Sequence, residues 1–238
     1  MIAPYVDLKG KNHESLFRFA SNDSELFSES KSTEILEKSR DPLKFRFCGY
    51  SIWLDICGSE EGGDYYSCID AIAEKFGLEP IQGHVTVIYG MTHLTDEEVR
   101  RTFREELMPR FVKERRNWPS LKPVGVLSDV ELDGVRGGMM DMAWSEISFS
   151  NSDEHESCVD LVHQIFYGSA KYREGIWRPH ASLAYDNPHS SPLSLFETMK
   201  VVAKYPSLLC SAVHVRGISL VKTEGYVTEW KVIDYFSF

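Results

Sequence analysis

The stretch GHVTVIYGMTHLTDEEV, residues 83–99, is the most informative part of the sequence, because a second stretch, PHASLAYDNPHSSPLSL at residues 179–195, follows the same pattern. When the two stretches are aligned, a histidine matches a histidine. Two residues further along, a small hydroxyl residue matches another small hydroxyl residue. The aligned pairs are His84 with His180, Thr86 with Ser182, Tyr89 with Tyr185, His93 with His189, and Thr95 with Ser191. The chain therefore contains two similar units, each with a strand followed by a helix.

Side-chain alternation gives each repeated strand two different faces. In a strand, residues two positions apart project from the same side, so the histidine and the hydroxyl of each motif share one face. Val85 and Val87 in the first motif, and Ala181 and Leu183 in the second, point the other way, toward the helix of their unit. One face of each strand therefore holds the reactive side chains, and the other face holds the side chains that pack in the core.

Strand and helix patterns continue on both sides of the repeat, in the same order twice. Strands are predicted within residues 47–56, 84–90, 123–132, 139–149, 179–185, 212–221 and 226–236. Helices are predicted over 65–76, from a capping box at Thr95 and Glu98 to about Trp118, over 153–167, and from Ser191 with Pro192 at its first position. This order favours an α+β fold of two pseudo-symmetric lobes, each an antiparallel sheet with helices on its outer face, enclosing a central cleft.

Composition and charge limit the possible organisation and partners. The first 46 residues, rich in Ser, Glu and Lys, are expected to form a partly mobile N-terminal extension, and 47–238 the bilobal domain. The net charge of −10 argues against a long nucleic acid as partner, but a small anion needs only local positive potential. No signal peptide, membrane span or CxxC pair is visible, so we expect a monomeric cytoplasmic protein with reduced thiols and no membrane partner.

The paired histidines predict a reaction. If the two lobes pack about a pseudo-two-fold axis, both imidazoles and both hydroxyls line one cleft. One imidazole then takes a proton from water while the other protonates a departing sugar oxygen, and the ordinary histidine pKa near 6.5 suits both roles. Thr86 and Ser182 would donate hydrogen bonds to the phosphate oxygens. The arrangement calls for no metal.

The motifs HVTV at 84–87 and HASL at 180–183 resemble those of the two-histidine (2H) phosphoesterase superfamily. YSIW at 50–53, PHASLAY at 179–185 and LVKTEGYVTEW at 220–230 are similar to segments of the plant and yeast type cyclic phosphodiesterases. The resemblance implies a metal-independent enzyme that needs no cofactor and is linked to tRNA splicing. It would hydrolyse ADP-ribose 1″,2″-cyclic phosphate to ADP-ribose 1″-phosphate, and nucleoside 2′,3′-cyclic phosphates to 2′-phosphates.

The resemblance also implies roles for individual residues. His84 and His180 are then the catalytic pair, Thr86 and Ser182 bind the phosphate, and Trp53 and Tyr185 line the substrate pocket. Alternation alone puts Tyr185 on the face opposite to Ser182, so its pocket role requires that the strand end or bulge before it. Trp177 and Arg178, just before the second motif, are further candidates for contact with a base and a phosphate.

Two other functions remain compatible with the same motifs. One is an enzyme that processes RNA 3′ ends with the same histidine pair, and the acidic charge counts against it. The other is a non-catalytic nucleotide-binding module that keeps the cleft. The three functions are distinguished by their expected behaviour, which is turnover of a mononucleotide, turnover of an oligonucleotide, or binding without turnover.

Overall fold

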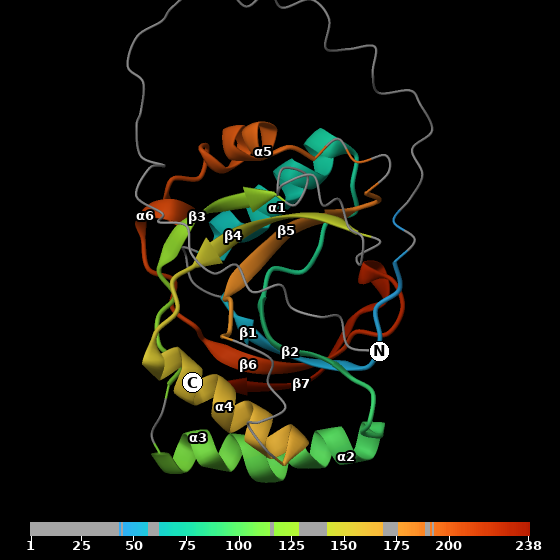
Figure 1. Cartoon of the computed structure of the whole chain (residues 1–238), viewed down its shortest axis with the longest axis vertical. Coiled ribbons are helices and arrows are strands. Elements are labelled where there is room, and N and C mark those ends of the chain that lie inside the picture. The colour runs from blue at the N-terminus through green and yellow to red at the C-terminus, as the bar shows by residue number, and fades with distance from the viewer. Residues whose placement is uncertain are drawn as a thin grey trace, which may run out of the picture. The chain divides into compact units, whose positions relative to one another are not determined.

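Both repeated strands form, and they lie next to each other in an antiparallel sheet (Figure 1). The structure is a computed structural model that describes residues 43, 45–56, 62–114, 117–128, 142–168, 176–188, 191 and 193–238. These residues belong to one folded unit, Pro42–Phe238. Nearly all of the predicted N-terminal extension, 1–46, lies outside the described residues.

The elements come in nearly the order that the sequence predicts. The strands are β1 (Tyr50–Asp55), β2 (Val85–Met91), β3 (Pro123–Ser128), β4 (Ala143–Phe149), β5 (His180–Asp186), β6 (Gly217–Lys222) and β7 (Lys231–Ser237). The α-helices are α1 (Gly62–Phe76), α2 (Asp96–Arg101), α3 (Met108–Glu114), α4 (Asp153–Tyr167), α5 (Leu195–Val202) and α6 (Ser207–Cys210). A π-helical segment, η1 (Thr102–Leu107), joins α2 to α3, and a 3-10 turn, η4 (Val227–Glu229), precedes β7.

The described strands form a seven-stranded sheet in the order β3-β4-β5-β2-β1-β6-β7, and every neighbouring pair is antiparallel. The predicted α+β class with antiparallel pairing is therefore confirmed. Most neighbours pair over several residues, but β2 and β5 pair only at Val85 and Ala181. This narrow junction divides the sheet into a group of three strands and a group of four.

Different helices cover the two groups of strands. Helix α1 contacts β5, α5 contacts β3, and the two helices contact each other. Helix α4 contacts β2 and the π-helical segment. Figure 1 shows α1 and α5 beside β3, β4 and β5, and it shows α2, α3 and α4 beside the other four strands. Each of the two repeated strands thus has its own helical layer.

Helix α1 follows its predicted pattern closely. Its apolar side chains at helical spacing are all buried, with Ile69 and Ile72 almost completely inaccessible. Gly77 directly follows the helix with φ of 62°, a left-handed conformation that glycine adopts without a Cβ clash. Since the face and the end both match, local sequence alone determines this helix.

The helical run after Thr95 begins as predicted but ends earlier. Thr95 and Glu98 form the expected capping box. The described helix then continues through η1 and α3 to Glu114, whereas buried Trp118 lies beyond it. The buried residues along the run recur every fourth position: Val99, Phe103, Leu107 and Phe111. A spacing of four exceeds the 3.6 residues of an α-helical turn, and the wider π-helical turn keeps this stripe facing the core.

Two predicted boundaries near the C-terminus are wrong. Helix α5 begins at Leu195 and not near Ser191, because Ser194 is its N-cap and accepts a hydrogen bond from the Glu197 N–H at 3.2 Å. Pro192 lies outside the described residues. The last strand begins at Lys231 and not at Tyr226, because the 3-10 turn η4 occupies the start of that segment.

No helix among the described residues combines the length and the apolar character needed to cross a membrane. The described cysteines are all free thiols: Cys48, Cys68, Cys158 and Cys210.

Candidate functional site

The junction between β2 and β5 brings the two sequence motifs together. Val85 pairs with Ala181, and these two residues occupy equivalent positions in the two repeats. Residues directly before and after a paired position project to the other face of both strands. The four predicted reactive side chains flank this pair and therefore share one face: His84, Thr86, His180 and Ser182.

Both histidines are held by the same backbone contact. Nδ1 of His84 lies 2.6 Å from the carbonyl oxygen of Gln82, and Nδ1 of His180 lies 3.0 Å from that of Arg178. A carbonyl oxygen only accepts hydrogen bonds, so Nδ1 carries a proton in each ring. In the neutral ring, Nε2 then presents its lone pair. Each histidine is bonded two residues back along the chain, so the two rings are anchored alike.

Both strands also contain an extra residue at the same position of the repeat. Strand β2 has Val87 in excess between its pairs with Trp53 and Ile52, and β5 has Leu183 in excess between its pairs with Glu146 and Ser145. Such a bulge shifts the following side chains to the other face. The condition that the sequence set for Tyr185 is therefore met.

Tyr185 lies on the same side of the sheet as Ser182. Its hydroxyl donates a hydrogen bond to the Ser182 Oγ at 2.7 Å. Burial, together with the negative charge of Glu146, raises the pKa of Tyr185 to about 12, although the bond to Ser182 opposes this effect. The phenol therefore stays protonated at neutral pH and keeps its hydrogen available for Ser182.

His84 is buried among aromatic rings. Its imidazole stacks on Trp53 at 3.6 Å between centroids with an interplanar angle of 13°, and it faces the edge of Trp230 at 6.0 Å. Only 4% of the residue is exposed. Desolvation, opposed by the bond to Gln82 and assisted by the nearby charge of His180, lowers the pKa of His84 to about 4. At neutral pH His84 is uncharged and can accept a proton.

His180 has a more polar environment. Its side chain is 29% exposed, and its Nε2 lies 3.8 Å from Oε2 of Glu146 on β4. Glu146 is completely buried and accepts hydrogen bonds from Trp144 Nε1 at 2.8 Å, Ser148 Oγ at 2.7 Å and Arg178 Nη2 at 2.9 Å. The sequence prediction missed Glu146, although WSEIS at 144–148 places a carboxylate between a tryptophan and a serine on one strand face.

The predicted substrate-binding aromatics occupy different environments. Trp53 is only 2% exposed, and one face of its ring is covered by His84. Trp177 is 9% exposed and its indole N–H donates to the Thr86 carbonyl oxygen at 3.0 Å, so it contacts the backbone of β2. Arg178 is exposed and its guanidinium reaches Glu146. Of the four predicted substrate-binding residues, Tyr185, Trp177 and Arg178 thus contact Ser182, Thr86 and Glu146 through polar groups, whereas Trp53 stacks on His84.

One aromatic residue near the site had no predicted role. Trp230 is half-buried and contacts Trp53, His84 and Tyr185 edge-on, at 5.3, 6.0 and 6.1 Å between centroids. Phe47 completes the cluster, 4.7 Å from Trp230. The Trp230 indole nitrogen has no hydrogen-bond partner among the described residues. Its position in the chain, far from both motifs, gave no local signal of this contact.

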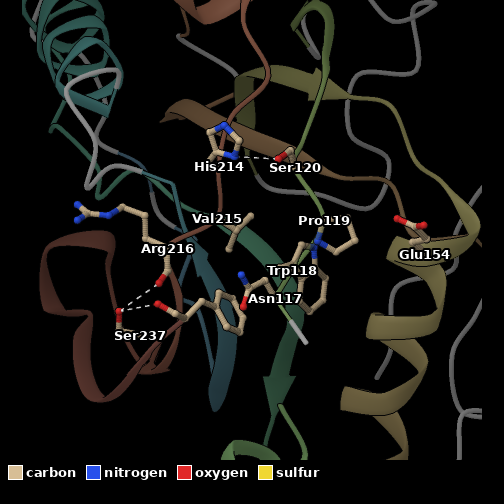
Figure 2. A pocket seen from close by; sticks show the side chains of 10 residues that line it. Asn117, Trp118, Pro119, Ser120, Glu154, His214, Val215, Arg216 and Ser237 are labelled. Carbon is tan, nitrogen blue, oxygen red and sulfur yellow. Dashed lines mark hydrogen bonds between the residues drawn. The ribbon is translucent and has the colours of Figure 1, made fainter. Parts of the chain in front are cut away.

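A cavity of about 590 Å³ is lined by none of the predicted residues (Figure 2). Its walls come from residues 117–120, the first turn of α4, residues 214–216 and residues 237–238. His214 and Ser120 are hydrogen-bonded there at 2.9 Å. Volume alone specifies no chemistry, whereas the paired motifs combine two imidazoles with two hydroxyls, so we place the candidate active site at the β2–β5 junction.

Metal-binding clusters and known relatives give no independent indication of the chemistry. Among the residues that the structure describes, no group of three or more His, Cys, Asp or Glu side chains is arranged to hold a metal ion. No protein-family model matches the chain, and no curated protein matches it.

Proposed function

We propose that this protein is a cyclic phosphodiesterase that uses His84 and His180 as a general acid and base pair. The observation that supports this most directly is the single pairing of Val85 with Ala181, which sets both imidazoles on one face with matching Nδ1 contacts. The substrates are ADP-ribose 1″,2″-cyclic phosphate, which gives ADP-ribose 1″-phosphate, and nucleoside 2′,3′-cyclic phosphates, which give 2′-phosphates.

The reaction is an in-line displacement by water at phosphorus. The neutral histidine takes a proton from water at Nε2 as the water oxygen bonds to phosphorus. The protonated histidine gives its Nε2 proton to the ribose oxygen whose bond to phosphorus breaks. Afterwards the two rings have exchanged protonation states, and proton exchange with solvent restores them. No electron transfer and no third reactant are needed.

The hydroxyl groups provide the complementary electrostatics. Charge on the non-bridging phosphate oxygens grows toward the transition state, and fixed hydrogen-bond donors aimed at them lower the barrier. Ser182 accepts a hydrogen bond from Tyr185, which leaves its own hydrogen free for a phosphate oxygen. Thr86 occupies the equivalent position on β2.

We also propose that residues 47–238 form two pseudo-symmetric lobes around this site. Equivalent residues pair at the junction, equivalent strands bulge after the hydroxyl residue, and each strand has a separate helical layer. A two-fold axis through the pairing of Val85 with Ala181 relates His84 to His180 and Thr86 to Ser182. The cleft would then receive one imidazole and one hydroxyl from each lobe.

We propose that the protein acts on small nucleotides as a monomer in the cytoplasm, without a cofactor. Its net charge of −10 disfavours tight contact with many phosphates of a long nucleic acid. The protonated histidine would supply local positive potential for a small anion.

Product analysis tests the proposal. The purified protein is incubated with EDTA and either ADP-ribose 1″,2″-cyclic phosphate or adenosine 2′,3′-cyclic phosphate, and the products are resolved as 1″-, 2′- or 3′-phosphates. We expect turnover of at least one substrate, with the 2′-phosphate as nucleoside product. Folded protein that hydrolyses neither would refute the proposal.

A third substrate, an oligonucleotide ending in a 2′,3′-cyclic phosphate, tests the substrate class. Faster turnover of the oligonucleotide would replace the small-nucleotide assignment with RNA 3′-end processing. Binding of AMP or ADP-ribose with no turnover of any of the three would indicate a nucleotide-binding module.

A further inference from the structure

We propose that Trp177 is a positioning residue that holds the two histidine motifs in place across the narrow junction between β2 and β5. This inference rests on the proposed function and deepens it, because the same two strands would bind the phosphate. It gives Trp177 a role through the main chain of Thr86 and not through contact with a base.

The junction itself is narrow. Strands β2 and β5 pair only at Val85 and Ala181, whereas β5 pairs with β4, and β1 with β6, over most of their lengths. A single pair sets the register of two strands, but it leaves them free to twist or open about that point. The proposed reaction needs His84 and His180 at fixed places beside one phosphate group. A second link between the strands is therefore expected.

Trp177 supplies this second link. Its indole N–H donates to the Thr86 carbonyl oxygen at 3.0 Å. Trp177 lies just before β5, and Thr86 follows Val85 on β2, so the bond joins the two repeats next to their single pair. The Trp177 side chain is buried, and a buried N–H that loses its acceptor is costly because water does not replace the bond. The bond therefore resists separation of the two strands.

The main chain of Trp177 is fixed to helix α4. Its N–H donates to Oε1 of Glu156 at 3.1 Å, and its carbonyl oxygen accepts from Nδ2 of Asn151 at 2.7 Å. Glu156 lies in the first turn of α4, and Asn151 lies just before the helix. The indole ring also packs against the rings of Trp118 and His155, at 5.7 and 5.9 Å between centroids. Because its main chain and its ring are both held, Trp177 fixes β2 relative to α4.

The same anchor also positions the second motif. The residue after Trp177 is Arg178, whose carbonyl oxygen accepts the hydrogen bond from Nδ1 of His180. One segment thus holds the imidazole of His180 and, through Trp177, the main chain of Thr86. These two groups come from different strands but share this support.

Trp118 provides a matched control. It is 3% exposed and contacts Trp177, but its indole nitrogen has no hydrogen-bond partner among the residues that the structure describes. Trp177→Phe and Trp118→Phe each remove a buried indole and keep an aromatic ring, so their packing losses are comparable. Of the two, Trp177→Phe alone removes a hydrogen bond to β2. The difference between the variants therefore measures the contribution of that bond.

Amide hydrogen exchange of the ligand-free protein is the first test. We expect Trp177→Phe to speed exchange in 84–87 and 180–183 about tenfold relative to β6 and β7, because strands that open locally expose their amides to water. Trp118→Phe should leave the relative rates of these segments unchanged. Equal acceleration in all segments, or none at the junction, overturns the inference.

Kinetics on two cyclic nucleotides provides the second test. Trp177→Phe should lower kcat about tenfold on both adenosine and uridine 2′,3′-cyclic phosphate and change KM less than about twofold, because misplaced groups affect mainly the transition state. Trp118→Phe should keep kcat within about twofold of the native value. A contact between Trp177 and the base would instead raise KM and affect the two nucleotides unequally. That result, or equal kcat losses in both variants, contradicts a positioning role.

The two tests separate this inference from the proposed function. Hydrogen exchange requires no turnover, so it decides the role of Trp177 even if no cyclic phosphate is hydrolysed. If Trp177→Phe does not fold, Asn151→Leu replaces it, since this change removes the donor to the Trp177 carbonyl oxygen and keeps the indole. Asn151→Leu should also speed exchange at the junction, and native exchange there would overturn the inference.

Discussion

The strand that carries His84 and the strand that carries His180 share a backbone plan but differ in their surroundings. Each anchors its histidine through Nδ1 to the carbonyl two residues earlier, and each bulges one residue after the hydroxyl. His84, however, is buried against Trp53, whereas His180 is partly exposed beside the carboxylate of Glu146. The repeat positions two equivalent imidazoles, and their neighbours make them chemically different.

This difference matters because general acid and base catalysis needs one ring in each protonation state at the same pH. Two histidines in identical surroundings would titrate together, and only a fraction of the molecules would hold the productive combination. Desolvation keeps His84 neutral at neutral pH, so this ring is in the state that a general base needs. The predictions below test whether the repeat and its asymmetry act as described.

The largest expected effect comes from removing either imidazole. His84→Ala and His180→Ala should each lower kcat on adenosine 2′,3′-cyclic phosphate by about a hundredfold or more, because each removes a proton-transfer group. His93→Ala is the matched control, since His93 lies in the same repeat but its Nε2 bonds to the Phe166 carbonyl at 3.1 Å. The control should stay within about twofold of the native rate. A motif variant with native kcat would exclude that histidine from the reaction.

The burial of His84 also predicts a pH-dependent stability. Its folded pKa of about 4 lies below the ordinary value near 6.5, so between these values the unfolded chain binds a proton that the folded chain does not. This contribution is complete above pH 6.5, falls as the pH drops toward 4, and is worth up to about 3 kcal/mol. Urea unfolding at neutral pH and near pH 4.5 measures it. His84→Gln should lose less stability between the two conditions than native protein, whereas exposed His214→Gln should match it.

Local patterns in the sequence predicted those parts of the fold that depend on local chemistry. Alternation fixed the shared face of His84 and Thr86, and Thr95 with Glu98 fixed the start of a helix. The π-helical turn was not predictable, because it depends on which side of the helix packs against the core. The apolar residues recur every fourth position, and the wider turn keeps them on that side. Glu146 was missed because a glutamate on a strand is ordinarily expected to be exposed to solvent. Its partner, Arg178, lies 32 residues away in the sequence.

The bulges in β2 and β5 were also not predictable from local sequence patterns. Alternation assigned Tyr185 to the wrong face unless the strand was interrupted, and nothing in Leu183 or Val87 marks either as an extra residue. The interruptions are visible only in the pairing with the neighbouring strands, β4 and β1. The matching tyrosines of the two repeats were a local hint for Tyr185, whose hydroxyl contacts Ser182, but Tyr89 contacts Cys48 instead.

Removal of the two motif hydroxyls should lower kcat less than removal of an imidazole, and the two hydroxyls should differ from each other. Ser182 is 4% exposed and its oxygen is fixed by Tyr185, so its hydrogen is already directed when substrate binds. Thr86 is less buried. We expect Ser182→Ala to lower kcat about thirtyfold and Thr86→Ala about tenfold, with substrate KM changing less. Equal KM increases with unchanged kcat would instead mean that the hydroxyls hold the ground state.

The smallest expected effect concerns the two tyrosines. Tyr185→Phe removes the hydrogen bond to Ser182 and should lower kcat about threefold, because the serine hydroxyl becomes free to rotate. Tyr89→Phe is the matched control, since the Tyr89 hydroxyl instead accepts from the Cys48 N–H at 3.2 Å. Combined with Ser182→Ala, Tyr185→Phe should cause no further loss, because its partner is already gone. If the losses multiply instead, Tyr185 acts on the substrate directly and the proposed path through Ser182 is wrong.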